Sequence, residues 1–351
     1  MAAYTTIDNP ELYFQVKTYT GNGSTQSITL DGDENMSPNF VWIKARSSGQ
    51  ENILFDTVRG VTNWLQSDNT SAEADQNTSL TSFDSDGFSL ADIGEVNANT
   101  YTYVAWCWKA GTSFSNDASA TSIGTIDTTG SVSETSGFSI ISYDGTGANG
   151  TIKHGLSTAP RTMLFKNRDE GAEGWFVYHE SIGNTKRLLL DDTSTTSTSS
   201  TFYQDTSPTS SIITLGSNHG CNGPDAMICY AFSERQGFSK FGSYTGNGNA
   251  DGTYVHLGFR PAWVMVKETG NVNSWRILDN KRDTFNVMTK PLYANLNNAE
   301  GSSGHNTDFT AQGFKIRDSD TSMNRSGGSF IFMAFAEAPF VNSKGVPANA
   351  R

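Results

Sequence analysis

The stretch YTGNGNADGTYVHLGFRPAWVMVK (residues 244–267) holds two tight-turn signals, a short strand between them, and alternating apolar residues that end in a lysine. Two related stretches occur earlier, YTGNGSTQSITLDGDENMSPNFVWIK (19–44) and YDGTGANGTIKHGLSTAPRTMLFK (143–166). Each begins Tyr-x-Gly-x-Gly and carries a proline six residues before its final lysine, namely Pro38, Pro160 and Pro261. Self-similarity of this kind predicts a chain built from copies of one structural unit.

Other phrases recur around these stretches in a fixed order. NILFD (52–56), WFVYH (175–179) and WRILD (275–279) occupy one place, and YTYVAWCWK (101–109), AMICYAFSE (226–234) and SFIFMAFAE (329–337) close the copies. The closing runs are apolar at both alternating sets of positions, which predicts central strands covered on both faces. Many short strands separated by turn signals predict an all-β chain of three tandem antiparallel β-sandwich or jelly-roll-like repeats, each of about 100 residues and globular in its own right.

The repeats fix the expected boundaries. In chain order these are an N-terminal arm (1–11), repeat 1 (12–111), a Ser/Thr/Gly-rich linker (112–136), repeat 2 (137–236), repeat 3 (237–340) and a polar, exposed C-terminal tail (341–351). The first segment is interpreted either as a frayed terminus or as an arm that docks on a partner. The linker is interpreted as an extended segment with room for a short strand at SIGTI (122–126).

Composition excludes several classes of function. Only 17% of the 351 residues are charged and the net charge is −12, without a basic run, so we expect no nucleic-acid binding and no polybasic membrane contact. No apolar run is long enough to span a membrane, and the first ten residues lack the apolar region of a signal peptide. Cys107, Cys221 and Cys229 are too few for a disulfide framework. Cys107 and Cys229 lie in apolar runs at equivalent positions of the copies, and we expect them to be buried. Cys221 lies in a loop beside His219, and these two residues are too few for a zinc site. We expect a protein made in a reducing cytoplasm.

Three lysines recur at the ends of equivalent strands: Lys44, Lys166 and Lys267. One active site would not need three copies of a reactive lysine. We therefore expect the ammonium groups to lie at the rim of the sandwiches and to pair with carboxylates. Asp56 and Asp279 are the candidate partners.

Histidines recur less regularly. His154 and His256 both lie shortly before the proline, and we expect each to stabilise a turn by a hydrogen bond rather than to act as an acid or base. His219 and His305 lie in loops with no obvious carboxylate or nucleophile signature.

Few residues suggest binding chemistry. Asp31 and Asp33 alternate as in a calcium loop, but the glycine and glutamate of such a loop are missing. Trp64 lies in a polar stretch and is the tryptophan expected to be free for binding. No catalytic motif occurs, so we expect no enzyme, no catalytic residues, no cofactor and no metal. The weak binding candidates are Trp64, Asp31 and Asp33.

Several of these phrases resemble a known family. GFSIISYDGTGANGTIKHGLSTAPRTMLFKNR, YTYVAWCWKAG and SFIFMAFAEAPF are similar to repeat-containing virion structural (tail fibre-like) proteins of marine tailed phages. The similarity covers residues 12–340. Repeat 1 departs from the pattern, with SITLDGDENMSP where the others carry a histidine, so its loop is expected to be specialised.

The resemblance implies a non-enzymatic virion protein made in the host cytoplasm. The first hypothesis is a tail fibre or tail appendage subunit that contributes to host-surface attachment. The alternative is a capsid decoration or head fibre protein that docks on the major capsid protein, and the third is a glycan-cleaving tail spike. The expected partners are other virion proteins, further copies in a homo-oligomer with a trimer favoured, and a host-surface glycan or protein.

Overall fold

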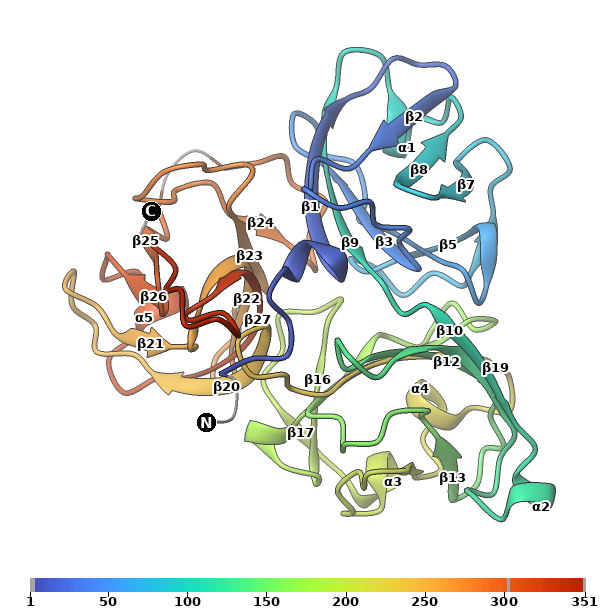
Figure 1. Ribbon diagram of the computed structural model, residues 1–351. Coiled ribbons are helices and arrows are strands. Elements are labelled where there is room, and N and C mark those ends of the chain that lie inside the picture. The colour runs from blue at the N-terminus through green and yellow to red at the C-terminus, as the bar shows by residue number, and fades with distance from the viewer. Residues whose placement is uncertain (1–3, 302–303, 350–351) are drawn as a thin grey trace.

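The computed structural model describes residues 4–301 and 304–349, and these form mostly antiparallel strands (Figure 1). The expected all-β fold of the sandwich class is confirmed. The strands form three pairs of sheets, each with a larger and a smaller sheet, which we call units 1, 2 and 3 in chain order. No helix of these residues is long and apolar enough to cross a membrane.

The sheets of unit 1 lie within the first third of the chain. The larger sheet has the order β1 (Phe14–Thr20), β9 (Thr102–Trp108), β3 (Phe40–Ala45), β4 (Ile53–Asp56), β5 (Gly60–Gln66) and β6 (Ala74–Asp75). The smaller has β2 (Gln26–Thr29), β8 (Gly87–Leu90) and β7 (Leu80–Asp84).

Unit 2 has the widest sheet. Its order is β10 (Thr112–Asn116), β11 (Thr128–Ser133), β12 (Phe138–Asp144), β19 (Ala226–Phe232), β14 (Thr162–Asn167), β15 (Phe176–His179), β16 (Lys186–Leu189) and β17 (Ser197–Thr198). The smaller sheet pairs β13 (Gly150–Lys153) with β18 (Ile212–Leu215).

Unit 3 completes the chain. Its larger sheet has β20 (Ser239–Thr245), β27 (Ser329–Pro339), β22 (Phe259–Glu268), β23 (Arg276–Asp279) and β24 (Leu292–Tyr293). Its smaller sheet has β21 (Tyr254–His256), β26 (Gly313–Ile316) and β25 (Thr307–Thr310). The helices are single turns: η1 (Pro10–Leu12), α1 (Gly94–Asn97), α2 (Ala118–Thr121), η2 (Glu180–Ile182), α3 (Ser200–Tyr203), α4 (His219–Asn222) and α5 (Thr321–Asn324).

The larger sheets share one strand order. In each, the strand closing the unit lies between the strand that leads into the Tyr-x-Gly-x-Gly turn and the strand that ends near the recurring lysine. The orders are β1-β9-β3-β4, β12-β19-β14-β15 and β20-β27-β22-β23. The closing strands are buried on both faces, as their apolar pattern predicts. In β9, Trp106 packs into one core cluster and Cys107 into another.

Two expected segments differ in the structure. Residues 112–136, predicted to be a linker, contain β10 and β11, which extend the larger sheet of unit 2. The Ser/Thr-rich composition hid these strands, because it lacks the apolar alternation by which strands are recognised in a sequence. SIGTI forms no strand, although Ile126 makes one bridge to Ile152.

The first residues contact their own chain. Residues 1–3 of the expected arm and 350–351 of the expected tail lie outside the described part. Of the rest, Ile7 is in the core, and Thr5 donates a hydrogen bond of 2.8 Å to the Gln236 carbonyl of the connection into unit 3. The side chain of Asp8 accepts hydrogen bonds from Ser343 in the tail.

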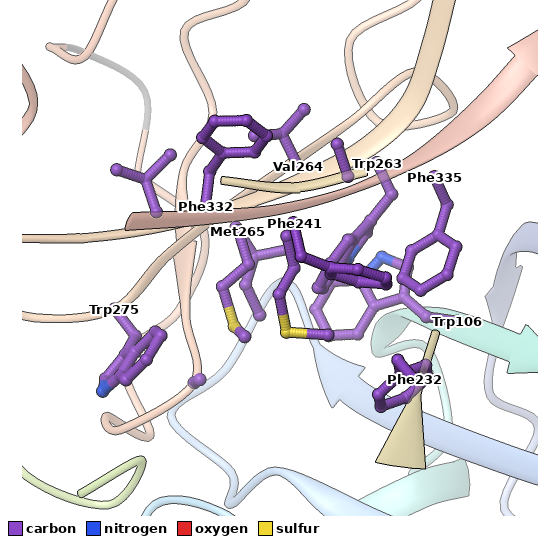
Figure 2. Close-up of a cluster of buried hydrophobic side chains, with 14 of the residues drawn as sticks. Trp106, Phe232, Phe241, Trp263, Val264, Met265, Trp275, Phe332 and Phe335 are labelled. Carbon is purple, nitrogen blue, oxygen red and sulfur yellow. The ribbon is translucent and has the colours of Figure 1, made fainter. Parts of the chain in front are cut away.

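The units are not separate beads, which corrects the expectation of three independently globular repeats. One hydrophobic cluster runs through all of them, because the larger sheets turn their second faces toward a common centre. Figure 2 shows Trp106 of unit 1 and Phe232 of unit 2 beside Trp263 and Phe335 of unit 3. A buried aromatic side chain of this kind contributes about 1.5–3 kcal/mol. Each unit therefore depends on the other two to cover this face.

Backbone hydrogen bonds close the units into a ring. In each case a backbone N–H of one unit donates to the backbone carbonyl of the residue that lies two positions after the recurring lysine of another unit. The three hydrogen bonds run from Glu300 to Arg46 (2.7 Å), from Glu73 to Arg168 (2.7 Å) and from Thr196 to Thr269 (3.1 Å). These bonds run from unit 3 to unit 1, from 1 to 2, and from 2 to 3. Because the third returns to the start, the three units have a cyclic, threefold-like arrangement within one chain.

A buried asparagine, which no sequence motif predicted, holds each Tyr-x-Gly-x-Gly turn by hydrogen bonds. Asn97, Asn222 and Asn324 are fully buried, and each accepts a hydrogen bond on its side-chain oxygen from the residue between Tyr-x-Gly and the second Gly. The backbone carbonyl of each also accepts from that second glycine. The recurring turn motif is thus part of the framework.

Candidate functional site

A surface cavity of about 400 Å³ lies in unit 2 where β14 begins, and we call it the Arg161 cavity. Pro160 is buried and comes just before β14, a place that proline can occupy because it lacks a backbone N–H for the ladder. The residues that line it are Thr158, Ala159, Pro160, Arg161, Tyr178, Glu180, Ser207, Pro208, Ser233 and Glu234. A volume of this size lies within the range of small-molecule sites, about 300–1,000 Å³.

The charged side chains of the cavity come from three separate strand ends. The Nη1 atom of Arg161 lies 2.9 Å from Oε2 of Glu180 and 3.7 Å from Oε2 of Glu234. All three are partly exposed, with 44%, 52% and 29% of the side-chain surface open to solvent. Solvent-exposed ion pairs stabilise a fold by about 0–1 kcal/mol at most, so this group is poorly explained by stability.

Hydrogen bonds of the backbone fix the positions of these charged residues. The backbone N–H of Arg161 donates to Phe232 O (2.8 Å), and that of Glu180 donates to Arg161 O (2.8 Å). The hydroxyl of Ser233, next to Glu234, donates to Thr158 O (2.8 Å). Ladder and turn hydrogen bonds therefore hold the cavity wall in one geometry, and the charged groups project from a rigid base.

The equivalent places in the other units have different chemistry. Asn39 and Ala262 follow Pro38 and Pro261 as Arg161 follows Pro160. In unit 1 a cavity of about 410 Å³ is lined by Asn39, Thr57 and residues of β10 and β11, with no charged side chain among its lining residues. In unit 3 the cavity has shrunk to about 20 Å³, and Glu11, Phe14 and Gln15 from the start of the chain line it. Only unit 2, among the described residues, combines an open cavity here with an arginine and two carboxylates.

Comparison with known families gives one match. Residues 9–339 match the family described as Domain of unknown function (DUF7483). The chain belongs to this family. No curated protein and no solved structure matches it. The family description names no activity, so a function has to be inferred from the geometry of the chain.

The sequence-derived binding candidates do not form a site together. Trp64 lies in β5 and is only 7% exposed, packed in the core of unit 1, so the expectation of a free tryptophan is wrong. Asp31 is exposed and pairs with the ammonium group of Lys17 at 2.5 Å. Asp33 is exposed too, and no third ligand joins these aspartates among the described residues.

The recurring lysines are fully buried and pair differently from the expectation. Their ammonium groups donate to backbone carbonyls of a different unit: Lys44 to Asn297 (3.0 Å), Lys166 to Thr70 (3.1 Å) and Lys267 to Thr193 (3.2 Å). Burial lowers the pKa of all three to about 8. Neither Asp56 nor Asp279 is a partner. The lysines therefore link neighbouring units of the ring, because their ammonium groups are hydrogen-bonded to backbone carbonyl oxygens.

Asp56 and Asp279 have other partners. Each accepts hydrogen bonds from the arginine three positions later in the chain and from an aromatic side chain of a neighbouring unit. Asp56 accepts from Arg59 Nε (2.5 Å) and from the hydroxyl of Tyr230 in unit 2 (2.7 Å). Asp279 accepts from Arg282 Nε (2.6 Å) and from the indole N–H of Trp106 in unit 1 (3.0 Å). The signal that could have revealed this was the spacing Asp-x-x-Arg, present in both copies.

The histidines divide into two groups. His154 stabilises a turn as expected, with Nδ1 accepting from Leu156 N and Nε2 facing Thr209 O, whereas His256 is exposed. His219 and His305 do have carboxylate neighbours, contrary to the expectation, at 3.7 Å from Glu170 and 3.3 Å from Asp320.

His219 also belongs to a small polar group. With Glu170 and Glu173 it forms the one set of three potential metal-binding side chains found among the described residues, with ligand atoms within 4.8 Å of each other. The Lys166 ammonium donates to the backbone carbonyls of both glutamates, which places a cation beside them.

Cys107 and Cys229 are buried, as expected, and Cys221, which was expected to lie in a loop, is buried as well, in the single-turn helix α4. Burial raises the pKa of the Cys107 thiol well above its usual range and that of Cys221 to about 12, so neither forms a nucleophilic thiolate at neutral pH.

The Arg161 cavity could not be predicted from local sequence patterns, because Arg161, Glu180 and Glu234 lie in three separate stretches of the chain. The available signal was a difference between copies, where Pro-Arg replaces Pro-Asn and Pro-Ala.

Proposed function

We propose that this protein is a non-enzymatic structural component of a phage virion that contributes to attachment at the host surface, as a subunit of a tail fibre or tail appendage. The resemblance of its repeated phrases to tail fibre-like virion proteins motivates this. The observation that carries it is the closed ring of three sandwiches. A ring in which every unit covers part of its neighbours' core is a rigid scaffold that presents loops outward.

The ring also bears on the second candidate, a capsid decoration or head fibre protein. Three beads in a row would have favoured an elongated part, but the units surround a common centre (Figure 1). A compact body with threefold-like symmetry fits a position on a local threefold axis of a capsid as well as it fits the axis of a trimeric tail appendage.

Location in the virion decides between these candidates. Purified phage particles are labelled with gold-conjugated antibodies raised against the full chain and viewed by electron microscopy. Gold on tails or appendages supports the first candidate, and gold on heads supports the second. Particles that contain no detectable chain by mass spectrometry would contradict both.

A glycan-cleaving tail spike is the third candidate. Glycan cleavage needs two carboxylates about 5–10 Å apart across a substrate groove. Incubation of the purified chain with host envelope polysaccharide tests this directly, since release of reducing ends would support cleavage. Binding without release supports attachment alone.

The proposed partners are other virion proteins, further copies of the chain, with a trimer in first place, and a glycan or protein of the host surface. Two large apolar side chains on one loop of unit 3 support a protein contact, since Phe285 is 80% exposed and Val287 is 42% exposed. Light scattering coupled to size exclusion gives the mass, and a mass of one chain would contradict the homo-oligomer. We place the protein in the virion, after synthesis in the host cytoplasm.

A further inference from the structure

The Arg161 cavity differs from its counterparts in ways that folding does not require. The counterparts in units 1 and 3 keep the same backbone framework with Asn39 or Ala262 in place of Arg161. The fold is therefore compatible with neutral side chains at this place. In unit 2 the site has retained both the open volume and three charged groups, and the exposed ion pairs among them stabilise little.

The polar groups of the cavity complement hydroxyl groups. The guanidinium of Arg161 can only donate hydrogen bonds, and the carboxylates of Glu180 and Glu234 can only accept them. A hydroxyl does both, so two neighbouring hydroxyls of one ligand can bridge the arginine and a glutamate. The hydroxyl of Ser207, which accepts a hydrogen bond of 3.1 Å from the side-chain amide of Asn184, also lines the cavity and can both donate and accept hydrogen bonds.

The charge of the cavity argues against ionic ligands of negative sign. One arginine and two glutamates give a formal charge of −1, and Arg161 is already paired with both carboxylates. The remaining lining includes the apolar ring of Pro208 and the methyl group of the exposed Ala159, which offer contact to the C–H face of a sugar ring. Rigid apolar surface with a few converging polar groups is typical of small-molecule sites.

We propose that the Arg161 cavity binds a neutral saccharide, one or two sugar units of a larger glycan, through neighbouring hydroxyls held by Arg161, Glu180 and Glu234. This rests on the proposed role in attachment and assigns it a site. Each site binds weakly because it is open to water, and several copies of the chain on one particle raise the effective affinity.

The test uses the purified full-length chain and three neutral probes: methyl α-D-mannopyranoside, methyl β-D-galactopyranoside and methyl α-D-glucopyranoside. Saturation-transfer NMR titrations measure binding, with N-acetylneuraminic acid as an anionic probe and N-acetyl-lysine methylamide as a cationic one. We expect saturable binding of at least one neutral glycoside. Loss of a hydrogen bond to a charged group should weaken it by about tenfold or more in Arg161→Ala and in Glu180→Gln.

A matched control exists in unit 3. Arg260 pairs with Glu337 at 3.2 Å, and Glu337 occupies the place of Glu234, but the adjoining cavity measures only about 20 Å³. Arg260→Ala should therefore leave glycoside binding unchanged. The variant Glu180→Gln alters an exposed carboxylate and should remain folded even if Arg161→Ala does not, which circular dichroism checks.

Three results would overturn the proposal: no neutral glycoside binds the folded wild type, a charged probe binds more tightly than all three glycosides, or folded Glu180→Gln binds as the wild type does. Tighter binding of the lysine derivative would indicate a basic protein side chain as the ligand. The outcome is separable from the proposed function, since glycoside binding by a protein that is absent from virions would contradict the virion assignment and leave the cavity assignment standing.

Discussion

The hydroxyl of Tyr230 in unit 2 donates a hydrogen bond of 2.7 Å to the carboxylate of Asp56 in unit 1. Both residues are fully buried, 174 positions apart in the chain, and Arg59 supplies the charge that Asp56 requires. Polar groups buried in this way are stable only when all of them have partners, so the contact fixes how two units meet.

Tyr230→Phe should lower the free energy of unfolding by about 1.5–3 kcal/mol, because a charged acceptor loses one buried donor. Chemical denaturation followed by tryptophan fluorescence measures this. Tyr254→Phe is the matched control, since Tyr254 is 46% exposed. Equal stabilities for the two variants would mean that the Tyr230 hydroxyl does not support the interface.

Unit 3 alone, residues 237–340, should fail to fold as a stable monomer. Excision would expose the face of its larger sheet that carries Trp263, Met265 and Phe335, all 3% exposed or less in the whole chain. We expect aggregation or strong binding of a hydrophobic dye, measured against the full-length chain. A soluble fragment with one sharp unfolding transition would contradict the shared core.

Lys166→Met should destabilise the chain by about 1–3 kcal/mol, because three backbone carbonyls, of Thr70, Glu170 and Glu173, lose their shared donor. Lys315→Met serves as the control, since that ammonium pairs with the exposed Asp251 at the surface. Thermal unfolding of both variants gives the comparison. A larger loss for the surface variant would contradict the role of the buried lysines as ring fasteners.

Acidification should weaken the ring through His179. Burial lowers the pKa of this histidine to about 4, against an ordinary value near 6.5. Between pH 6.5 and 4 the unfolded chain therefore binds a proton that the folded chain does not, so the stability contribution falls as the pH is lowered through this window. The geometry agrees, because Nδ1 accepts from Ser181 N and cannot carry a proton while Nε2 faces Phe332 O.

His179→Gln should make the free energy of unfolding less dependent on pH over this range than it is in the wild type. Denaturation at pH 7, 5.5 and 4.5 tests the slope, and the exposed His256→Gln is the control. An unchanged slope in His179→Gln would exclude this histidine as a source of acid sensitivity.

Trp64→Ala should lower the free energy of unfolding by about 3–5 kcal/mol, as expected when a large side chain is removed from a packed core. Glycoside titration of the conservative Trp64→Phe variant should match the wild type. A loss of binding with unchanged stability would restore Trp64 as a binding residue.

The candidate site was only partly within reach of the sequence. Comparison of the three copies could reveal that Arg161 follows the proline in unit 2, whereas Asn39 and Ala262 follow it in units 1 and 3. It could not reveal that Glu180 and Glu234 lie beside Arg161, because the pairing of β14 with both β15 and β19 brings them there. Nor could the sequence show that residues at the start of the chain line the small equivalent cavity in unit 3.

The amino-acid sequence by itself determined the all-β class, the closing strands buried on both faces and the burial of Cys107 and Cys229 within those strands. These follow from local patterns, since a side-chain period of two and the turn residues between strands act over a few positions. The tertiary structure alone decided that Lys166 reaches Thr70, that Tyr230 meets Asp56 and that Trp64 is covered. Such contacts join residues far apart in the chain, and they form only when three sheets bury their second faces against each other.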